Sequence, residues 1–157
     1  MKKVIFSFLI LIILIFNPVS SRLFTIITAY YHDLDVEKFY NLIKNESSFR
    51  CFAYSSSGAI GLGQVKKETA FFIEEDYPPF LLWIPFSNLS MSVKYLKYLK
   101  NRFNNNWSLV LAAYNWGETN VDKRIKTKNI KIDTEKDYSS LFKDIPETKK
   151  LLSKILN

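Results

Sequence analysis

The sequence has 157 residues, with 22 basic and 15 acidic side chains, a net charge of +7, one histidine and one cysteine. One cysteine excludes an intramolecular disulfide, and one cysteine with one histidine does not form the ligand cluster of a zinc site, so no metal or cofactor is expected. Because the basic residues are scattered among acidic ones, we expect no nucleic-acid partner. The positive charge favours anionic polymers or lipids of the cell envelope.

The chain begins with two lysines and continues with an uncharged apolar run over residues 4–16. This order is typical of a secretory signal. Small residues at 19–21 predict cleavage before Arg22, which would separate a signal segment, residues 1–21, from a domain of residues 22–157. The renewed apolar run over 23–31 leaves a second option, a membrane anchor retained through residues 4–16. We therefore expect an exported protein, either periplasmic or in the cell envelope, including attachment to the inner membrane.

The rest of the chain is predicted to be one all-α domain, because apolar residues recur at helical spacing and no series of alternating strands is found. Helices are expected over 23–31, 36–47, 69–75, 90–103, 107–114 and 146–156. Asp35 is a plausible N-cap for the second of these helices. Three prolines predict a loop over 77–86, and residues 118–138 are expected to be irregular or partly helical. The helix over 107–114 is apolar on nearly all sides, which predicts a central position.

Glu46 is the candidate catalytic residue, because it falls at the end of the predicted helix 36–47. The negative end of the helix dipole disfavours an ionised carboxylate there. Mostly apolar residues follow over 49–54, and we expect them to desolvate the carboxyl group and raise its pKa, as a general acid requires. Three glycines between 58 and 63 then predict a loop that a ligand can approach closely. His32 lies far from any nucleophile motif, so a Ser-His-Asp or Cys-His mechanism is not expected.

A second polar segment, Tyr114-Asn115-Trp116-Gly117, closes the apolar helix 107–114. The glycine fits a helix stop. A buried tyrosine hydroxyl needs a hydrogen-bond partner, and a glutamate carboxyl group is a suitable one.

These segments resemble the soluble-type, lysozyme-like lytic transglycosylases. Four blocks of the family match in order, namely Glu46 to Gln64, Asn88 to Leu96, Leu111 to Gly117, and Ile145 to Lys149. The resemblance covers about residues 26–156, and its first and third blocks are jointly specific.

The sequence departs from the family pattern at five positions, which are Gly63 (usually methionine), Ser92 (glycine), Trp116 (alanine), Lys149 (arginine) and Leu151 (near a tyrosine). The change at Gly63 removes an apolar wall from the expected cleft. We expect Trp116 to refill that space.

The resemblance implies a helical fold like that of goose-type lysozyme, with a cleft for peptidoglycan strands. It makes Glu46 the single catalytic acid and base, oriented by Tyr114. The substrate-binding residues that it implies are Ser55, Gln64, Tyr114 and Asn115. Cleavage would fall between N-acetylmuramic acid and N-acetylglucosamine and leave a 1,6-anhydro ring, because the family uses the C6 hydroxyl of the substrate in place of water.

Two other functions remain open. A muramidase would cut the same bond with water, and its water-activating carboxylate would be sought among Glu68, Glu74 and Glu75. A catalytically weak glycan-binding protein would instead serve as a component of an envelope machine, such as a flagellum or secretion apparatus. The presence of both Glu46 and Tyr114 favours an enzyme.

Overall fold

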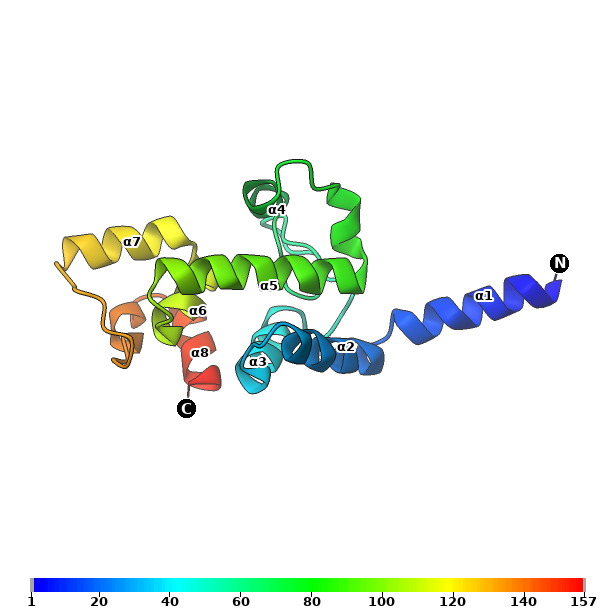
Figure 1. Ribbon diagram of the computed structural model, residues 1–157, viewed down its shortest axis with the longest axis horizontal. Helices are drawn as coiled ribbons and strands as arrows, with labels where there is room; N and C mark the ends of the chain where they lie inside the picture. Colours follow the sequence, from blue (N-terminus) through cyan, green and yellow to red (C-terminus); the bar gives the residue numbers. More distant parts are fainter. Residues whose placement is uncertain (1, 157) are drawn as a thin grey trace. The chain divides into compact units, whose positions relative to one another are not determined.

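The computed structural model describes residues 2–156, and among them every side chain outside 2–4 and 8–11 (Figure 1). Met1, the first residue of the predicted signal segment, and Asn157, the last residue of the predicted domain, lie outside the described residues. Within the described chain there are eight α-helices and two 3₁₀ helices, with isolated bridges at Ile60 and no named strand. The all-α prediction is confirmed.

The chain divides into two compact units, Met1–Val93 and Lys94–Asn157. The first unit holds α1 (Lys2–Ile15), α2 (Pro18–Tyr31), α3 (Val36–Ser47), α4 (Lys67–Ile73) and η1 (Pro79–Trp83). The boundary falls within α5 (Pro85–Arg102). The second unit continues with α6 (Trp107–Trp116), α7 (Glu118–Thr127), η2 (Ser139–Phe142) and α8 (Pro146–Ile155).

Most predicted helices are present, and α3 has the predicted bounds. The loop predicted over 77–86 is wrong in part, because η1 occupies Pro79–Trp83 and α5 begins at Pro85 rather than at Ser90. Proline is compatible with the first turn of a helix, where its missing N–H group would have no intrahelical partner. The segment 118–138 is partly helical, as expected, since α7 ends at Thr127.

The first unit packs α2 against α3 and gathers a core around the segment that follows α3. The buried members of this core are Ile60, Val65, Ala70, Tyr77, Leu82 and Met91. The core therefore joins the glycine-rich loop to α4, η1 and α5, which are far from it in sequence.

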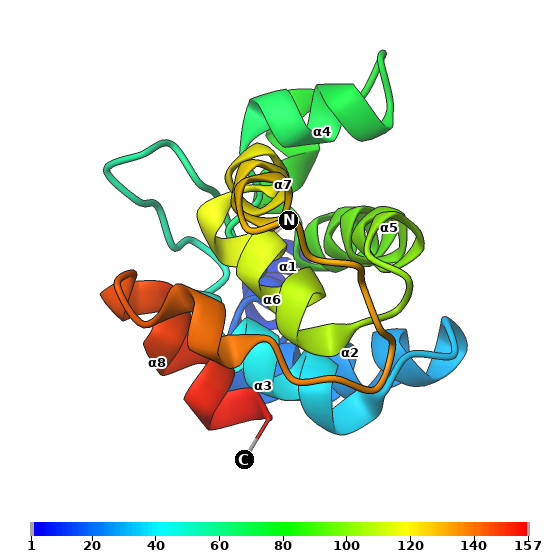
Figure 2. The same cartoon turned by 90° about the vertical axis from the view of Figure 1, so that its left-hand side faces the viewer.

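The second unit is built around α6. Residues 108–113 of this helix are all buried, and α7, α8 and η2 contact it (Figure 2). The predicted central position of this apolar helix is confirmed. Pro146 begins α8, also as predicted.

No single helix among the described residues is both long and apolar enough to cross a membrane. Taken together, the helical segments Ile5–Ile15 and Pro18–Tyr31 do satisfy these two criteria, although they are bent by 61° at the break between them. Asn17 caps the start of α2, since its side-chain oxygen accepts hydrogen bonds from the backbone N–H groups of Val19 and Ser20.

Asn106 ties the start of α6 to the irregular segment that follows α7. Its Oδ1 atom accepts hydrogen bonds from the Leu109 N–H group at 3.1 Å and from the Ser108 hydroxyl at 2.7 Å. Its Nδ2 atom donates to the backbone carbonyls of Asp133 and Lys136 at 2.8 and 2.7 Å. The Asn106 side chain is buried. Its amide therefore caps α6 and also provides hydrogen bonds to backbone carbonyls of a segment without regular secondary structure.

We predict that Asn106→Ala lowers the free energy of unfolding by about 2 kcal/mol or more, because it removes a cap and leaves buried polar groups unpaired. Urea denaturation monitored by circular dichroism measures the change. Asn101→Ala, at an exposed position on α5, is the control and is expected to change the stability little. Equal stability of the two variants would contradict the role given to Asn106.

Candidate active site

Glu46 lies in the last turn of α3, as the sequence predicts. The helix is capped at its start by Asp35, whose side chain accepts a hydrogen bond from the Lys38 N–H group, and it ends where Ser48 enters the left-handed conformation with a φ of 53°. Phe49 is also left-handed, with a φ of 62°. Two such residues in succession turn the chain sharply away from the helix axis. The Oε1 atom of Glu46 is buried at this turn.

The loop after Glu46 is closed by its own short-range hydrogen bonds. The Ser55 N–H group donates to the Ala59 carbonyl at 3.0 Å, and the Ser55 hydroxyl oxygen accepts from the Ala59 N–H group at 2.9 Å. Ile60 and Val65 exchange backbone hydrogen bonds at 3.0 and 3.1 Å. These contacts form a compact polar loop between α3 and α4.

The side chain of Asn88, on α5, supports this loop through three hydrogen bonds. Its Oδ1 atom accepts from the Gly63 N–H group at 2.8 Å. Its Nδ2 atom donates to the carbonyls of Ile60 at 2.9 Å and Leu82 at 2.8 Å. The buried amide thereby pairs with three backbone groups, one of which, the Ile60 carbonyl, also accepts from the Val65 N–H group.

Gly61 makes this close approach feasible. Its φ is +74°, and an added Cβ atom would lie 2.3 Å from Nδ2 of Asn88 and 2.6 Å from the Leu82 carbonyl oxygen. Neither distance is compatible with a side chain. The glycine is required both by the backbone conformation and by space.

Two predicted substrate-binding residues, Ser55 and Gln64, lie on this loop. Both are partly exposed. Gln64 is left-handed, with a φ of 49°, and its Nε2 atom donates to the Gly61 carbonyl at 3.0 Å and to the Ala53 carbonyl at 3.3 Å. The backbone of the loop thus orients the Gln64 amide.

The other two, Tyr114 and Asn115, lie at the end of α6 in the second unit. The Tyr114 ring packs against Tyr95 of α5, with the ring centroids 5.3 Å apart. Asn115 accepts a hydrogen bond at 2.8 Å from the Thr148 hydroxyl of α8. Burial raises the pKa of Tyr95 well above its usual range, and Glu118 raises it further. The ring that supports Tyr114 is therefore held as a neutral phenol.

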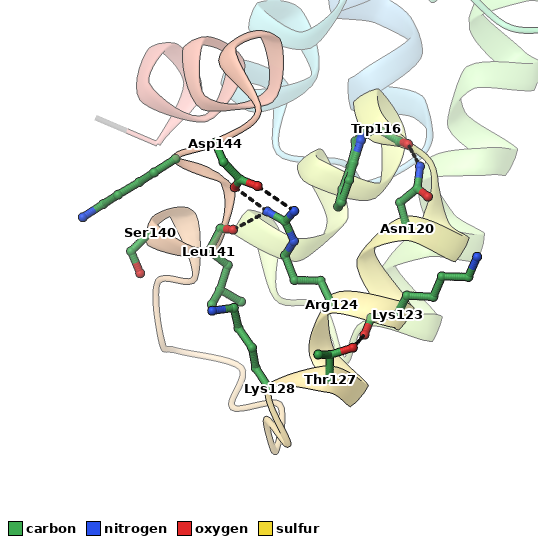
Figure 3. Close-up of a pocket in the computed structure, with 10 residues that line it drawn as sticks. Trp116, Asn120, Lys123, Arg124, Thr127, Lys128, Ser140, Leu141 and Asp144 are labelled. Carbon is green, nitrogen blue, oxygen red and sulfur yellow. Dashed lines mark hydrogen bonds and ion pairs between the residues drawn. The ribbon is translucent and has the colours of Figure 1, made fainter.

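Trp116, the next residue, borders a polar pocket of about 490 Å³ between α7 and η2 (Figure 3). Arg124 lies between Trp116 and Asp144 in this pocket. Its guanidinium carbon is 4.5 Å from the Trp116 ring centroid, and its nitrogens donate to the two oxygens of Asp144 at 2.6 and 2.8 Å. The guanidinium group holds the pKa of the Asp144 carboxyl below its usual value. Within its own unit, Trp116 also packs on Phe142.

Asn88 and Arg124 are the positioning residues whose roles the sequence does not reveal. Asn88 belongs to a motif block but carries no assigned role, and a polar residue at the start of a helix gives no hint of three buried partners. Arg124 lies in a short basic stretch that looks like a solvated surface. Among residues 2–156, no group of three or more His, Cys, Asp or Glu side chains is placed to hold a metal ion.

The transglycosylase SLT domain model matches residues 25–136, which is more than half of the chain. The chain belongs to the transglycosylase SLT domain family. The matched range includes the first three motif blocks, while the fourth, Ile145 to Lys149, lies beyond it.

Two solved structures are similar to this SLT domain. The lytic transglycosylase Slt of Pseudomonas aeruginosa, solved as an inactive glutamate-to-glutamine mutant, has a TM-score of 0.72 and 25% identity, over 88% of this chain and 23% of that one. The 70 kDa soluble lytic transglycosylase of Escherichia coli has a TM-score of 0.69 and 23% identity, over 82% of this chain and 22% of that one. This chain therefore spans less than a quarter of either relative. The lysozyme-like SLT fold implied by the motifs is confirmed.

We predict that Gly61→Ala disrupts the loop of the SLT domain, whereas Gly58→Ala is tolerated better. Both glycines have a positive φ, so each substitution incurs a backbone cost of about 1–2 kcal/mol. Only at Gly61 does the added methyl group also collide with the Asn88 amide and the Leu82 carbonyl, since nothing lies within 4 Å of it at Gly58. Denaturant titrations should show a clearly greater loss of stability for Gly61→Ala. Equal losses would mean that crowding at Asn88 has no energetic weight.

Proposed function

We propose that this SLT domain is a peptidoglycan lytic transglycosylase in which Glu46 is the general acid and base. The observation that carries the proposal is the placement of Glu46, at the last turn of α3 with a buried carboxyl oxygen, directly before the glycine-rich loop. Family membership supports the reaction class. The inactive glutamate-to-glutamine mutant of the Pseudomonas aeruginosa relative supports an essential glutamate in that protein.

The proposed reaction cuts the bond between N-acetylmuramic acid and N-acetylglucosamine and needs only one carboxyl group. Protonated Glu46 donates its proton to the glycosidic oxygen, and the N-acetylglucosamine side leaves as an alcohol. A positioned general acid contributes roughly 10²–10⁴-fold to such a step. The substrate's acetamido group supports the positive charge that develops at C1 of the muramic acid, which is a known alternative to a second enzyme carboxylate.

Glu46, now ionised, then removes the proton from the C6 hydroxyl of the same muramic acid. The C6 oxygen bonds to C1 and closes a 1,6-anhydro ring. Glu46 is returned to its protonated state, so the cycle consumes no water.

Ser55, Gln64, Tyr114 and Asn115 are proposed to bind the glycan strand. Gln64 and Asn115 support this role because internal hydrogen bonds orient both amides before any ligand is bound. A preorganised amide loses less conformational entropy on binding a sugar hydroxyl than a freely rotating one does.

We also propose that the protein is exported and works in the periplasm or cell envelope, where peptidoglycan lies. The positive net charge supports attraction to anionic envelope polymers. Assembly with an envelope or flagellar machine belongs to the same proposal.

We predict that Glu46→Gln abolishes the release of soluble muropeptides from purified sacculi, because the isosteric amide cannot donate the proton. The fold is expected to persist, so the circular dichroism spectrum should match that of the unmodified protein. Glu37→Gln is the matched control, since Glu37 is exposed in the first turn of the same helix. It should keep the full rate.

A Glu46→Gln variant that retained more than a few per cent of the rate would make Glu46 a structural residue. Loss of activity in both variants would point to damage to α3 rather than to lost chemistry.

We further predict that the released muropeptides end in 1,6-anhydro-muramic acid. Each such product is lighter by one water than the hydrolytic product and has no reducing end for borohydride to reduce. Mass spectrometry before and after borohydride treatment measures both properties.

If most of the released ends were reducible, the enzyme would be a muramidase rather than a transglycosylase. Glu68, Glu74 and Glu75 would then be the first carboxylates to substitute in the search for its water-activating residue. Saturable binding to sacculi without any release would instead favour a glycan-binding envelope component.

A further inference from the structure

The helix α2 has its small residues inside and its large apolar residues outside. At 3.6 residues per turn, Ser21, Thr25 and Ala29 fall on one side of the helix, and all three are fully buried. The opposite side, here called the outer face of α2, consists of Val19, Leu23, Ile26, Ile27, Tyr30 and Tyr31. These side chains are 42–81% exposed.

Two contacts with other elements fix this orientation of α2, and hydrogen bonds within the helix satisfy its buried hydroxyls. The Ser21 hydroxyl donates to the Asn17 carbonyl at 2.9 Å and lies 3.1 Å from the thiol of the buried Cys51. Thr25 donates to the Ser21 carbonyl at 2.7 Å. Phe24, at the flank, packs on Phe86 with ring centroids 4.1 Å apart. Rotating α2 to bury its outer face would break its contacts with Cys51 and Phe86.

An inverted helix of this kind is typical of proteins in contact with lipid. In water, exposing six large apolar side chains on one face is unfavourable. In a bilayer, small and hydroxyl-bearing residues pack between helices while large aliphatic residues face the acyl chains. Tyrosines at the end of such a face fit the membrane interface, and here Tyr30 and Tyr31 precede the polar turn 32–35.

The helix that precedes α2 also indicates contact with lipid. The helix α1 carries no charge after Lys3, and its described side chains Phe6 and Ile13 are well exposed. At 1.5 Å per residue α1 is roughly 21 Å long, shorter than the hydrocarbon core of about 30 Å. Figure 1 shows that α2 follows α1 directly at this end of the chain. The apolar surface of α1 is therefore continuous in sequence with the outer face of α2.

We propose that the chain keeps residues 1–21 and binds a phospholipid bilayer through α1 together with the outer face of α2. Cleavage before Arg22 would remove Asn17 and Pro18, which begin α2, and also Ser21, which is buried against Cys51. Arg22 is the only charged residue of α2, and with Lys2 and Lys3 it favours an anionic lipid surface. This inference is independent of the catalytic proposal.

The test uses the full chain with an environment-sensitive fluorophore on Ile27→Cys and vesicles of phosphatidylethanolamine and phosphatidylglycerol. Cys51 is only 4% exposed, so labelling is directed to the introduced thiol. The emission should shift to the blue when vesicles are added. The same label on Glu37→Cys, at an exposed position of α3, should not shift.

A flotation assay with unlabelled protein measures the contribution of the outer face. Leu23→Glu should weaken vesicle binding roughly tenfold or more, because a large apolar side chain no longer enters lipid. Phe80→Glu is the matched control, since Phe80 is 67% exposed but lies on η1, and it should float as the unmodified protein does. In addition, the mass of the protein from membranes of a bacterium producing the full chain should include residues 1–21.

Three results would overturn the proposal. A mature protein that starts near Arg22 would make residues 1–21 a signal peptide. Flotation without a blue shift at position 27 would limit lipid contact to α1. A blue shift at position 27 that grows with protein concentration in the absence of vesicles would assign the outer face to a second copy of the chain.

Discussion

The loop between α3 and α4 depends on the hydrogen bonds of one buried side chain, the amide of Asn88. The loop carries the glycines and two proposed glycan-binding residues, yet it has only isolated bridges in place of strands. Backbone groups in such a segment must find side-chain partners or water, because an unpaired buried group costs free energy. Asn88 supplies three partners from one side chain, and this needs a glycine at 61 so that the amide and the backbone can approach closely. Glu46 lies just before this loop, where the left-handed residues Ser48 and Phe49 turn the chain away from α3.

The features that the sequence predicts well are those set by local chemistry. Asp35 begins α3 because its carboxylate bonds to an N–H group within the next turn, and Gly117 ends α6 because its φ of 94° suits glycine. The central place of α6 follows from a helix that is apolar all round. The position of Glu46 in the last turn of α3 follows from the helical period of that segment, whereas its proposed role as the acid comes from the family motif.

The features that the sequence does not predict depend on contacts between distant residues. Prolines and aromatics over 77–86 are typical of a loop, and only packing of Leu82 into the core of the first unit reveals the short helix η1. The stacking of Arg124 on Trp116 and its ion pair with Asp144 join residues 8 and 20 positions away from it, which no periodicity encodes. The sequence shows α2 only as an apolar run, because the side that faces outward is decided by Ser21 and Cys51, which are 30 residues apart.

Taken together, the two proposals constrain which glycan the enzyme reaches. The turn between α2 and α3 is only four residues, and α3 packs on α2 within the same unit. Since α3 has 12 residues and rises 1.5 Å per residue, Glu46 lies within roughly 20 Å of the start of α3, and so close to any bilayer that holds α2. An enzyme held in this way samples only strands near the membrane surface, however active its acid is. Binding to lipid would therefore select the glycan strands nearest the membrane through geometry, without any residue that distinguishes one strand from another.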